Sequence, residues 1–478
     1  MPTIGRAMMP YHSGFAGAPM TDVDNLEARL DGLPFAGPVF RSVLLIALGF
    51  GFEIYDLFLT AYVTPGLTKA GYFSEASLGA IAHLSVIGIR GSGTFVFALF
   101  AGLFIGSISL GALADRYGRR TTFTVSLVWY SVCTAAMALQ HSGYWIDLWR
   151  FLAGIGLGIE LVTIDAYIAE LVPPSHRGRA FAWCQLIGFS VVPVVAFLAW
   201  MLVPTTPFSI EGWRFVVLVG AVGALGAWYL RRRLPESPRW LVRQQRYKEA
   251  SRVVTALETD YGRDRIAVSR PNTQNQRPID PPTNHKSERT RVVMLSVFNF
   301  FQTFGYYGFT AWVPTLLIAR GISVTTSLEY SFLIALANPV GPLLGLWLGD
   351  RLERKWQIVF AAIAVAIFGL AFAIISVPAW IIAFGAMTTV ANNVMSYAFH
   401  GYQAEVFPTK TRSQKIGFVY AWSRLSAAIS GPVIVALLAY GGAVAVFQWI
   451  ALSMGIVILS IGCFGERTQG HPLEFISN

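Results

Sequence analysis

Runs of about 20 mostly apolar residues recur along this chain from one end to the other. Each run is long enough to cross a hydrocarbon layer of about 30 Å as a helix. The 478 residues are 54% hydrophobic and 13% charged, whereas soluble domains are typically about a quarter charged. The pattern therefore predicts an all-α polytopic membrane protein with twelve transmembrane helices, and it excludes a soluble core.

The apolar runs fall into two sets of six, separated by a long polar connection. They predict five parts of the chain: an N-terminal tail (1–38), a six-helix bundle (39–230), a polar connection (231–290), a second six-helix bundle (291–465) and a C-terminal tail (466–478). Within the connection, we expect a charged helix from Gln244 to about Leu257 and a flexible linker at about 268–285.

The positive charge of the chain is distributed as membrane topology requires. The formal net charge is +10, but Lys and Arg lie between the apolar runs on alternate sides, which argues against a nucleic-acid partner. The short connections at about 141–143, 204–211 and 439–442 almost lack these residues. Because positive loops stay in the cytoplasm, we expect a multi-pass protein of the cell membrane with both termini and residues 231–290 cytoplasmic.

Two separate motifs recur at one distance along the chain. Asp115-Arg116 returns as Asp350-Arg351, and 350 minus 115 is 235. A longer pattern of tyrosine, glutamate, proline and arginine returns at the same offset: Tyr167, Glu170, Pro173 and Arg177, then Tyr402, Glu405, Pro408 and Arg412. This common register indicates an internal duplication. Repeated halves that rock about a site at the membrane midplane are typical of secondary transporters.

The fourth apolar run carries both close-packing and charged residues. Gly154 and Gly158 share one helix face, where they allow a second helix backbone to approach. Arg150, Glu160 and Asp165 lie in the same run. A charge inside lipid costs at least roughly 2.5–3.5 kcal/mol, so we expect such residues to face the protein interior or a water-filled cavity.

This run and the residues after it resemble a known family. The positions that carry the resemblance are Arg150, Gly154, Gly156, Gly158, Tyr167, Glu170, Pro173, Arg177, Gly178 and Arg179. They are similar to helix 4 and its exit loop in the sugar-porter branch of the major facilitator superfamily. The resemblance implies two six-helix bundles and transport by alternating access. It is closest to bacterial metabolite–proton symporters between the sugar porters and the organic-acid transporters.

A second group of motifs predicts a conformational latch and a gate. The latch matches the signature loop of the superfamily: Gly111, Asp115, Arg116, Gly118 and Arg119, with Asp350 and Arg351 as its second copy. The gate residues are Glu170, Arg177, Glu236, Arg239, Glu405 and Arg412, and we expect Glu170 and Glu405 to pair with Arg177, Arg179 and Arg412. The alternative for the latch is that its arginines only set topology.

Four residues are candidates for proton coupling. Asp56 aligns with an aspartate that binds the proton in proton-coupled members of the family, and Arg150 aligns with its partner. Since the first run is directed outward and the fourth inward, both should lie at similar depth in the outer half. Glu53 and Glu160 are further candidates. The alternatives are a permanent structural ion pair in a facilitator and, for Glu160, a hydrogen-bonded acid that is always neutral.

The substrate site is expected to be lined by amides and aromatic rings. The candidates are Gln185, Gln302, Tyr306, Tyr307, Asn392 and Asn393. Val192, Tyr307 and His400 depart from the sugar-porter pattern, which argues against a hexose. Arg424 lies inside an apolar run and needs a partner, which is Glu53, Glu160 or a substrate carboxylate. The alternative interpretation of the aromatic residues is packing or contact with the lipid interface.

The remaining features exclude several classes of function. The sequence has no metal-ligand cluster, no nucleotide-binding loop and no serine-hydrolase motif, so we expect no metal, no cofactor and no enzyme activity. The expected partners are a small-molecule substrate, H⁺ and the lipid bilayer, and we expect a monomer. A non-transporting membrane receptor on the same fold is the rival interpretation.

Overall fold

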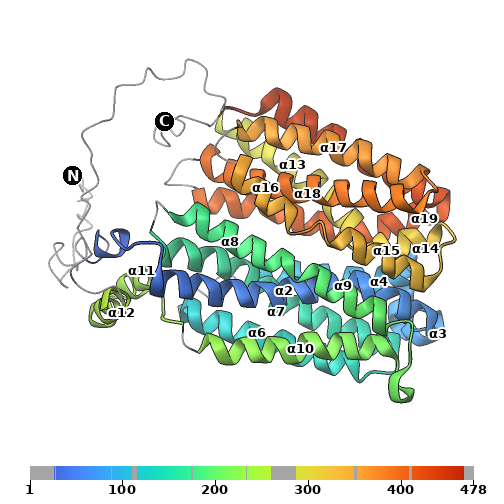
Figure 1. The fold of residues 1–478 in the computed structure, drawn as a ribbon, viewed down its shortest axis with the longest axis horizontal. Coiled ribbons are helices and arrows are strands. Elements are labelled where there is room, and N and C mark those ends of the chain that lie inside the picture. The colour runs from blue at the N-terminus through green and yellow to red at the C-terminus, as the bar shows by residue number, and fades with distance from the viewer. Residues whose placement is uncertain are drawn as a thin grey trace, which may run out of the picture.

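The computed structural model describes residues 26, 28–87, 89–109, 116–173, 176–232, 234–259, 287–348, 352–407 and 412–467. Every regular element in these residues is a helix, and the long helices run along one common direction (Figure 1). The first half of the structure contains α2 (Gly37–Lys69), α4 (Ser92–Ser109), α6 (Arg119–Ala138), α7 (Gly143–Leu171), α8 (Arg177–Ser190), α9 (Val192–Leu202) and α10 (Gly212–Arg231).

The second half contains a similar number of long elements. They are α13 (Glu288–Thr310), α14 (Val313–Ala319), α15 (Val324–Ala335), α16 (Val340–Leu348), α17 (Arg354–Ile374), α18 (Pro378–Val406) and α19 (Arg412–Phe464). Figure 1 shows the two halves as two adjacent groups of helices, one blue to green and the other yellow to red. The remaining elements are α3 (Glu75–Leu78), η1 (Gly79–Ile87), η3 (Pro207–Ser209), α11 (Pro238–Arg243) and α12 (Tyr247–Thr259).

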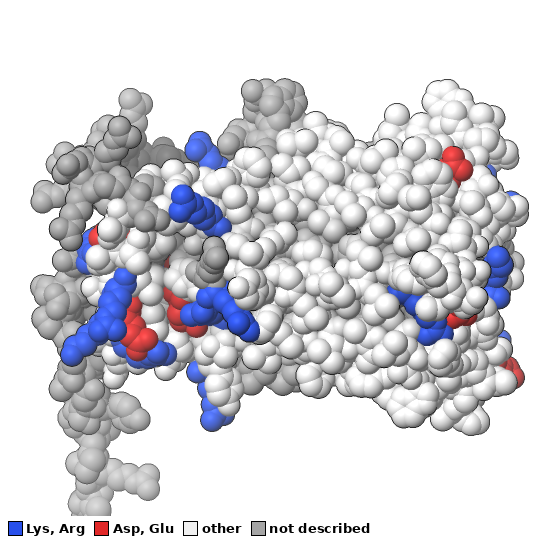
Figure 2. Space-filling view, turned by 60° about the horizontal axis from the view of Figure 1, so that its bottom comes forward, with Lys and Arg blue, Asp and Glu red and all other residues white. Residues whose placement is uncertain are grey.

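The surface is divided as a membrane protein requires. In Figure 2 a broad band without charged side chains separates two charged ends. We call the end that carries α11 and α12 the α12 end, and the opposite one the α3 end (Figure 1). Large apolar side chains are exposed on the band, among them Val222, Phe360 and Leu459. Such a band is stable against hydrocarbon and unfavourable in water.

Six helical segments in the described residues are long and apolar enough to cross a membrane. They are Gly37–Lys69, Arg119–Ala138, Arg177–Leu202, Gly212–Arg231, Arg354–Ile374 and Lys415–Phe464. Other predicted spans are interrupted. Ala311 and Trp312 separate α13 from α14, and Asn338 and Pro339 lie in the break between α15 and α16. Gly441 and Gly442 break the helical geometry within the last of the six segments. Pro339 lacks the N–H group that continues a helix, which explains the break before α16. Because six segments in the described residues meet the length and composition of a span, the number twelve stays a prediction.

Glycines bring α4 and α7 into close contact. A Cβ atom on Gly154 would lie 2.4 Å from the carbonyl oxygen of Leu99, and one on Gly158 would lie 2.3 Å from that of Leu103. On the other side, a Cβ on Gly106 would lie 2.1 Å from the carbonyl oxygen of Ile155. The shared face of Gly154 and Gly158 therefore packs against a helix, as its spacing indicated.

The connection between the halves is partly helical and docks on the N-terminal segment. Leu26 packs against Trp240 and Val254, and Arg29 forms an ion pair of 2.6 Å with Glu258. The expected helix from Gln244 begins instead at Tyr247, as α12. The predicted linker at 268–285 lies outside the described residues.

One boundary residue differs from its predicted environment. The sequence places Arg231 at the start of the polar connection, but it is the last residue of α10 and only 1% exposed. Its neighbour Arg232 is exposed. A long side chain at a helix end can turn back into the protein when an acid is present there, and Glu160 supplies one.

Candidate functional site

Asp56 of α2 and Arg150 of α7 form a buried ion pair. Arg150 donates from Nη1 to Oδ2 of Asp56 at 3.0 Å, and its Nη2 donates to the Asp56 carbonyl oxygen and to Oγ1 of Thr60. The hydroxyl of Thr134 in α6 donates to Oδ1 of Asp56 at 3.1 Å. Asp56 is 2% exposed and Arg150 is fully buried. Removing either charge would leave the other uncompensated, which is strongly unfavourable in a low-dielectric interior.

Glu160 forms a second buried ion pair that the sequence did not reveal. Arg231 Nη1 donates to Oε1 of Glu160 at 2.7 Å, and both side chains are at most 1% exposed. The guanidinium carbon lies 3.6 Å from the ring centroid of Phe123. A Cβ on Gly49 would lie 1.0 Å from Arg231 Nη2, so this glycine leaves the space that the arginine fills.

Arg424 of α19 is a buried cation near the boundary of the two halves. It is 3% exposed, donates to the Tyr420 hydroxyl at 3.1 Å and stacks on that ring at 4.7 Å. Tyr307 and Glu53 also interact electrostatically with it. Of the partners expected from the sequence, Glu160 is paired with Arg231 instead, whereas Glu53 lies within electrostatic reach of Arg424. The ion pairs of the described residues do not include one between Arg424 and a carboxylate.

The other predicted substrate residues lie in α13 and α18 of the second half, except Gln185, which lies in α8 of the first half. The Asn392 amide donates to the Gly305 carbonyl at 3.3 Å, and the Asn393 amide donates to the Asn338 carbonyl at 3.1 Å. The Tyr307 ring lies 4.7 Å from that of Phe100 in the first half. The remaining candidates vary in exposure: Gln302 and Tyr306 are buried and Gln185 is half-buried.

A small cavity lies between the halves, toward the α3 end. It is partly open, has little free space in this arrangement, and is lined by Phe58 and Tyr62 of α2 together with residues of α13, α14, α15 and α18. Its polar lining residues are Thr310, Ser331, Asn338 and Thr389. None of the seven predicted substrate residues lines it, although Asn393 contacts Asn338. The signal for Asn338 was the Asn-Pro break within a predicted span, since broken helices mark binding sites in transporters.

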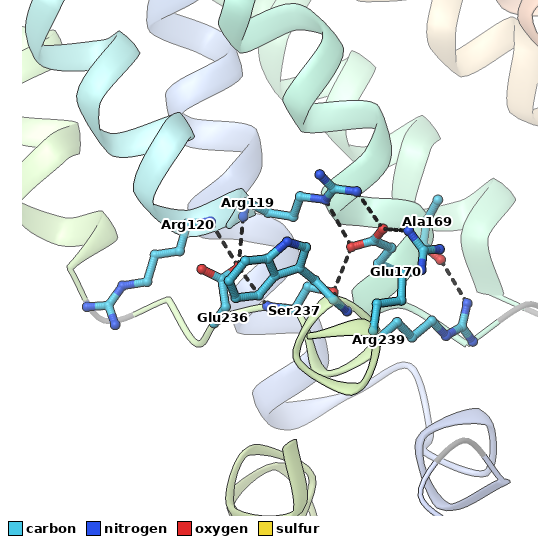
Figure 3. A network of polar contacts seen from close by, with 9 residues as sticks. Arg119, Arg120, Ala169, Glu170, Glu236, Ser237 and Arg239 are labelled. Carbon is cyan, nitrogen blue, oxygen red and sulfur yellow. Dashed lines mark hydrogen bonds and ion pairs between the residues drawn. The ribbon is translucent and has the colours of Figure 1, made fainter. Parts of the chain in front are cut away.

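At the α12 end, Glu236 caps the N-terminus of α6 (Figure 3). Its Oε1 accepts hydrogen bonds from the backbone N–H groups of Arg119 at 2.9 Å, Arg120 at 3.1 Å and Ser237 at 2.9 Å. An acid is favoured there because the helix N-terminus carries partial positive charge. Gly118 has φ +97°, and a Cβ on it would lie 2.4 Å from Glu236 Oε2, so the glycine of the motif is required by both geometry and space.

Glu170 of α7 is the centre of the same network (Figure 3). It forms an ion pair of 3.0 Å with Arg119 and one of 3.3 Å with Arg243, and it accepts a hydrogen bond of 2.7 Å from Ser237 Oγ. Arg239 donates to the Ala169 carbonyl at 3.1 Å. The loop after α10 is thereby fastened to the ends of α6 and α7.

The second half repeats one of these pairs at the predicted offset. Arg354 and Glu405 form an ion pair of 3.1 Å. Their positions lie 235 residues after Arg119 and Glu170, because 354 minus 119 and 405 minus 170 are both 235. The duplication seen in the motifs therefore extends to a side-chain contact.

The predicted partners of Glu170 were wrong, whereas the pairing predicted for Arg412 involves a side chain outside the described residues. Glu170 pairs with Arg119 and Arg243 rather than with Arg177 or Arg179. Arg177 donates to the Val172 carbonyl at 3.3 Å, and Arg179 is exposed. The two expected partners follow the end of α7 in the chain, but the start of α6 lies nearer to Glu170 in space.

Several latch residues cannot be placed. Gly111, Asp115, Asp350 and Arg351 lie outside the described residues, as does the side chain of Arg412. The side chain of Arg116 is exposed and lies over the Tyr117 ring at 5.4 Å. Within the described residues, no group of three or more His, Cys, Asp or Glu side chains could hold a metal ion.

Comparison with known proteins decides the family. The family model described as "Sugar (and other) transporter" matches residues 43–478. The chain belongs to this family. It is 29% identical to the putative metabolite transport protein YyaJ of Bacillus subtilis, over 94% of this chain and 97% of that protein. It is 28% identical to the niacin transporter NiaP of Acinetobacter baylyi, over 95% of this chain and 99% of that protein.

Further family members and a solved structure extend the picture. A benzoate transport protein of Acinetobacter baylyi is 24% identical, over 95% of this chain and 96% of its own. The xylose transporter XylE from E. coli, in a partially occluded inward open conformation, superposes with a TM-score of 0.71 at 18% identity, over 91% of this chain and 99% of that one. The chain is thus a multi-pass membrane transporter with the major facilitator fold, and not an enzyme.

Proposed function

We propose that this protein carries a small organic carboxylate across the cell membrane together with a proton, by alternating access. The observation that carries the proposal is Arg424, a buried cation at the boundary of the halves whose described contacts are tyrosines. A buried guanidinium is strongly stabilised by a carboxylate, which it can bind with two parallel hydrogen bonds. Relatives named for niacin and benzoate transport carry acids of this kind.

The proposed binding site lies between the two halves. Arg424 would hold the carboxylate, with Tyr307 and Tyr420 as hydroxyl donors beside it. The cavity lined by Asn338 and Thr389 would widen as the halves move and receive the rest of the substrate. The buried Gln302 would be a further polar contact. A site at the boundary of rocking halves can open to either side in turn.

The proton would be carried by Asp56. In the present arrangement its partner Arg150 favours the ionised form, and separation of the pair would favour the protonated acid because burial disfavours an unpaired charge. Glu53 lies one helical turn from Asp56 on α2 and interacts electrostatically with Arg424. This acid would connect the state of the proton site to the occupancy of the anion site.

The proposal includes the finer topology. Twelve spans follow if α8–α9, α13–α14 and α15–α16 each form one interrupted span and α19 forms two. The α12 end, with both termini and the connection between the halves, would face the cytoplasm. The networks around Glu170 and Glu405 would then act as the inner gate of a monomer in the bilayer, and they favour a moving transporter over a static receptor.

A binding experiment tests the anion site. We expect nicotinate, benzoate or a related aromatic acid to raise the melting temperature of the purified protein by mass action, and xylose to have no effect. Arg424→Gln should remove the shift, whereas Arg320→Gln, a change at the α3 end, should keep it. Stabilisation by xylose that persists in Arg424→Gln would favour a sugar facilitator instead.

A further inference from the structure

Asp147 is a buried acid that the proposed mechanism does not use. It lies one turn into α7 and is 1% exposed. Neither carboxyl oxygen has a hydrogen-bond partner of normal geometry in the described residues, and Thr94 of α4 is the polar side chain beside it. Burying an ionised carboxyl group without a cation is strongly unfavourable. Burial without a cation therefore favours the protonated form of Asp147 in this arrangement.

The position of Asp147 relates it to Arg150. The two residues are three apart on one helix, so their side chains leave the same face. Consecutive residues of α4 contact both: Thr94 lies beside Asp147, and the Phe95 ring lies 5.6 Å from the guanidinium carbon of Arg150. The Nε–H group of Arg150 has no acceptor in the described residues. A turn of its side chain along α7 would therefore reach Asp147.

The charge balance of the site gives Asp147 a role. If Asp56 alone were protonated, Arg150 would stay behind as a buried cation without a counter-ion, which is the most costly arrangement of such a pair. A second carboxyl group one turn away removes this cost, because it can become ionised as Asp56 becomes neutral.

We propose that Asp56 and Asp147 hold Arg150 in alternation. In the present arrangement Asp56 is ionised and Asp147 is protonated. In the other arrangement the Asp147 O–H bond has broken, Asp56 has gained an O–H bond, and Arg150 has moved to Asp147. One proton is released and one is bound, so the three groups have zero net charge in both arrangements. Asp147 lies on the α3 side of Arg150, which makes it the entry point for the proton.

The surroundings of Asp147 offer no rival counter-ion in the described part of the chain. α4 contains no charged residue. Glu75 of α3, His83 of η1, Arg90 before α4 and Lys69 at the end of α2 are all exposed. The arginines of α6, α8 and α11, which also pack against α7, lie at the α12 end. Asp56 of α2 is thus the acid that shares this depth with Asp147.

Thermal unfolding of the purified protein without substrate tests the alternation. This inference rests on the proposed role of Asp56 and Arg150, but the test does not depend on transport. Asp147→Asn should lower the melting temperature little, and Asp56→Asn moderately, since Arg150 then moves to Asp147. The melting temperature of the double variant should fall by more than the sum of the two single decreases, because Arg150 loses both counter-ions. Simple addition of the two falls would overturn the proposal.

A matched control and a second measurement make the outcome decisive. When Glu160→Gln is combined with Asp56→Asn, the two decreases in melting temperature should add, because Glu160 pairs with Arg231 and not with Arg150. Infrared spectra of the reconstituted protein at neutral pH should contain a carboxylic-acid C=O band that is absent from Asp147→Asn and from Asp56→Asn. If Asp147→Asn keeps the wild-type band, Asp147 is not the protonated acid and the proposal fails, even where the double variant does not fold.

Discussion

At the scale of single residues, this protein keeps its charges inside the bundle by pairing them. Asp56 with Arg150 and Glu160 with Arg231 form two fully buried pairs within the first half. Arg424 in the second half is surrounded by tyrosines instead. Under the proposed function, the two pairs are charges that the protein itself satisfies, and Arg424 is the charge that would bind the substrate.

The proton-coupling role predicts the effect of Asp56→Asn. The amide mimics the protonated acid, so the variant should lose accumulation of substrate against a gradient and its stimulation by acidic outside pH. Exchange of substrate across the membrane should continue, because exchange needs no net proton movement. Uptake and counterflow in membrane vesicles measure the two activities. If Asp56→Asn still accumulates substrate, the proton must be bound elsewhere, and Glu53 and Glu160 are the next candidates.

The pair of Glu160 and Arg231 predicts a large loss of stability in Arg231→Ala. The variant leaves a buried carboxylate without its cation, which costs about 3–5 kcal/mol. Arg232→Ala is the control, since it removes an exposed arginine at the next position and should cost less than about 0.5 kcal/mol. Thermal unfolding of the two purified variants makes the comparison. Equal melting temperatures would show that the ion pair contributes nothing.

At the scale of elements, apolar length and glycine spacing were sufficient to predict much of the first half. The predicted contact face of Gly154 and Gly158 is the face that meets α4. The pairing of charges was harder to predict, because it depends on which helix ends meet. Arg231 follows an apolar run and precedes other arginines, so its position in the chain indicates a topology signal, and only its place beside Glu160 shows otherwise.

The close contact of α4 and α7 predicts that Gly154→Leu is strongly destabilising. A Cβ at this position already lies 2.4 Å from a backbone oxygen, so the two helices must separate. Gly226→Leu in α10 is the control, because nothing lies within 4 Å of a Cβ there. Expression of folded protein and its melting temperature are the measurements. A Gly154→Leu variant as stable as Gly226→Leu would contradict the packing.

At the scale of the whole molecule, the duplication was visible in the sequence and its contacts are visible in the structure. The pairs Arg119–Glu170 and Arg354–Glu405 share the offset of the motifs. The substrate site was less predictable, since the residues that line the cavity come from five helices in both halves. The predicted gate residues lie in motifs that recur along the chain, whereas no recurring motif contains the residues that line the cavity.

The proposed topology predicts the sides from which two positions can be labelled. Ser287 precedes α13 at the α12 end, and Thr206 lies in the loop before η3 at the other end. A cysteine at Thr206 should react with a membrane-impermeant reagent in intact cells, and a cysteine at Ser287 only after the cells are opened. Reaction of the cysteine at position 287 in intact cells would show that the protein has the opposite orientation in the membrane.

Uptake by proteoliposomes tests the central claim most directly. The purified protein is reconstituted, an inward proton gradient is imposed, and accumulation of the aromatic acid identified by thermal shift is followed with and without a protonophore. The account predicts accumulation that the protonophore abolishes, and none in Arg424→Gln. Uptake that equilibrates at the same rate whether or not the gradient is present would contradict proton coupling and show a facilitator.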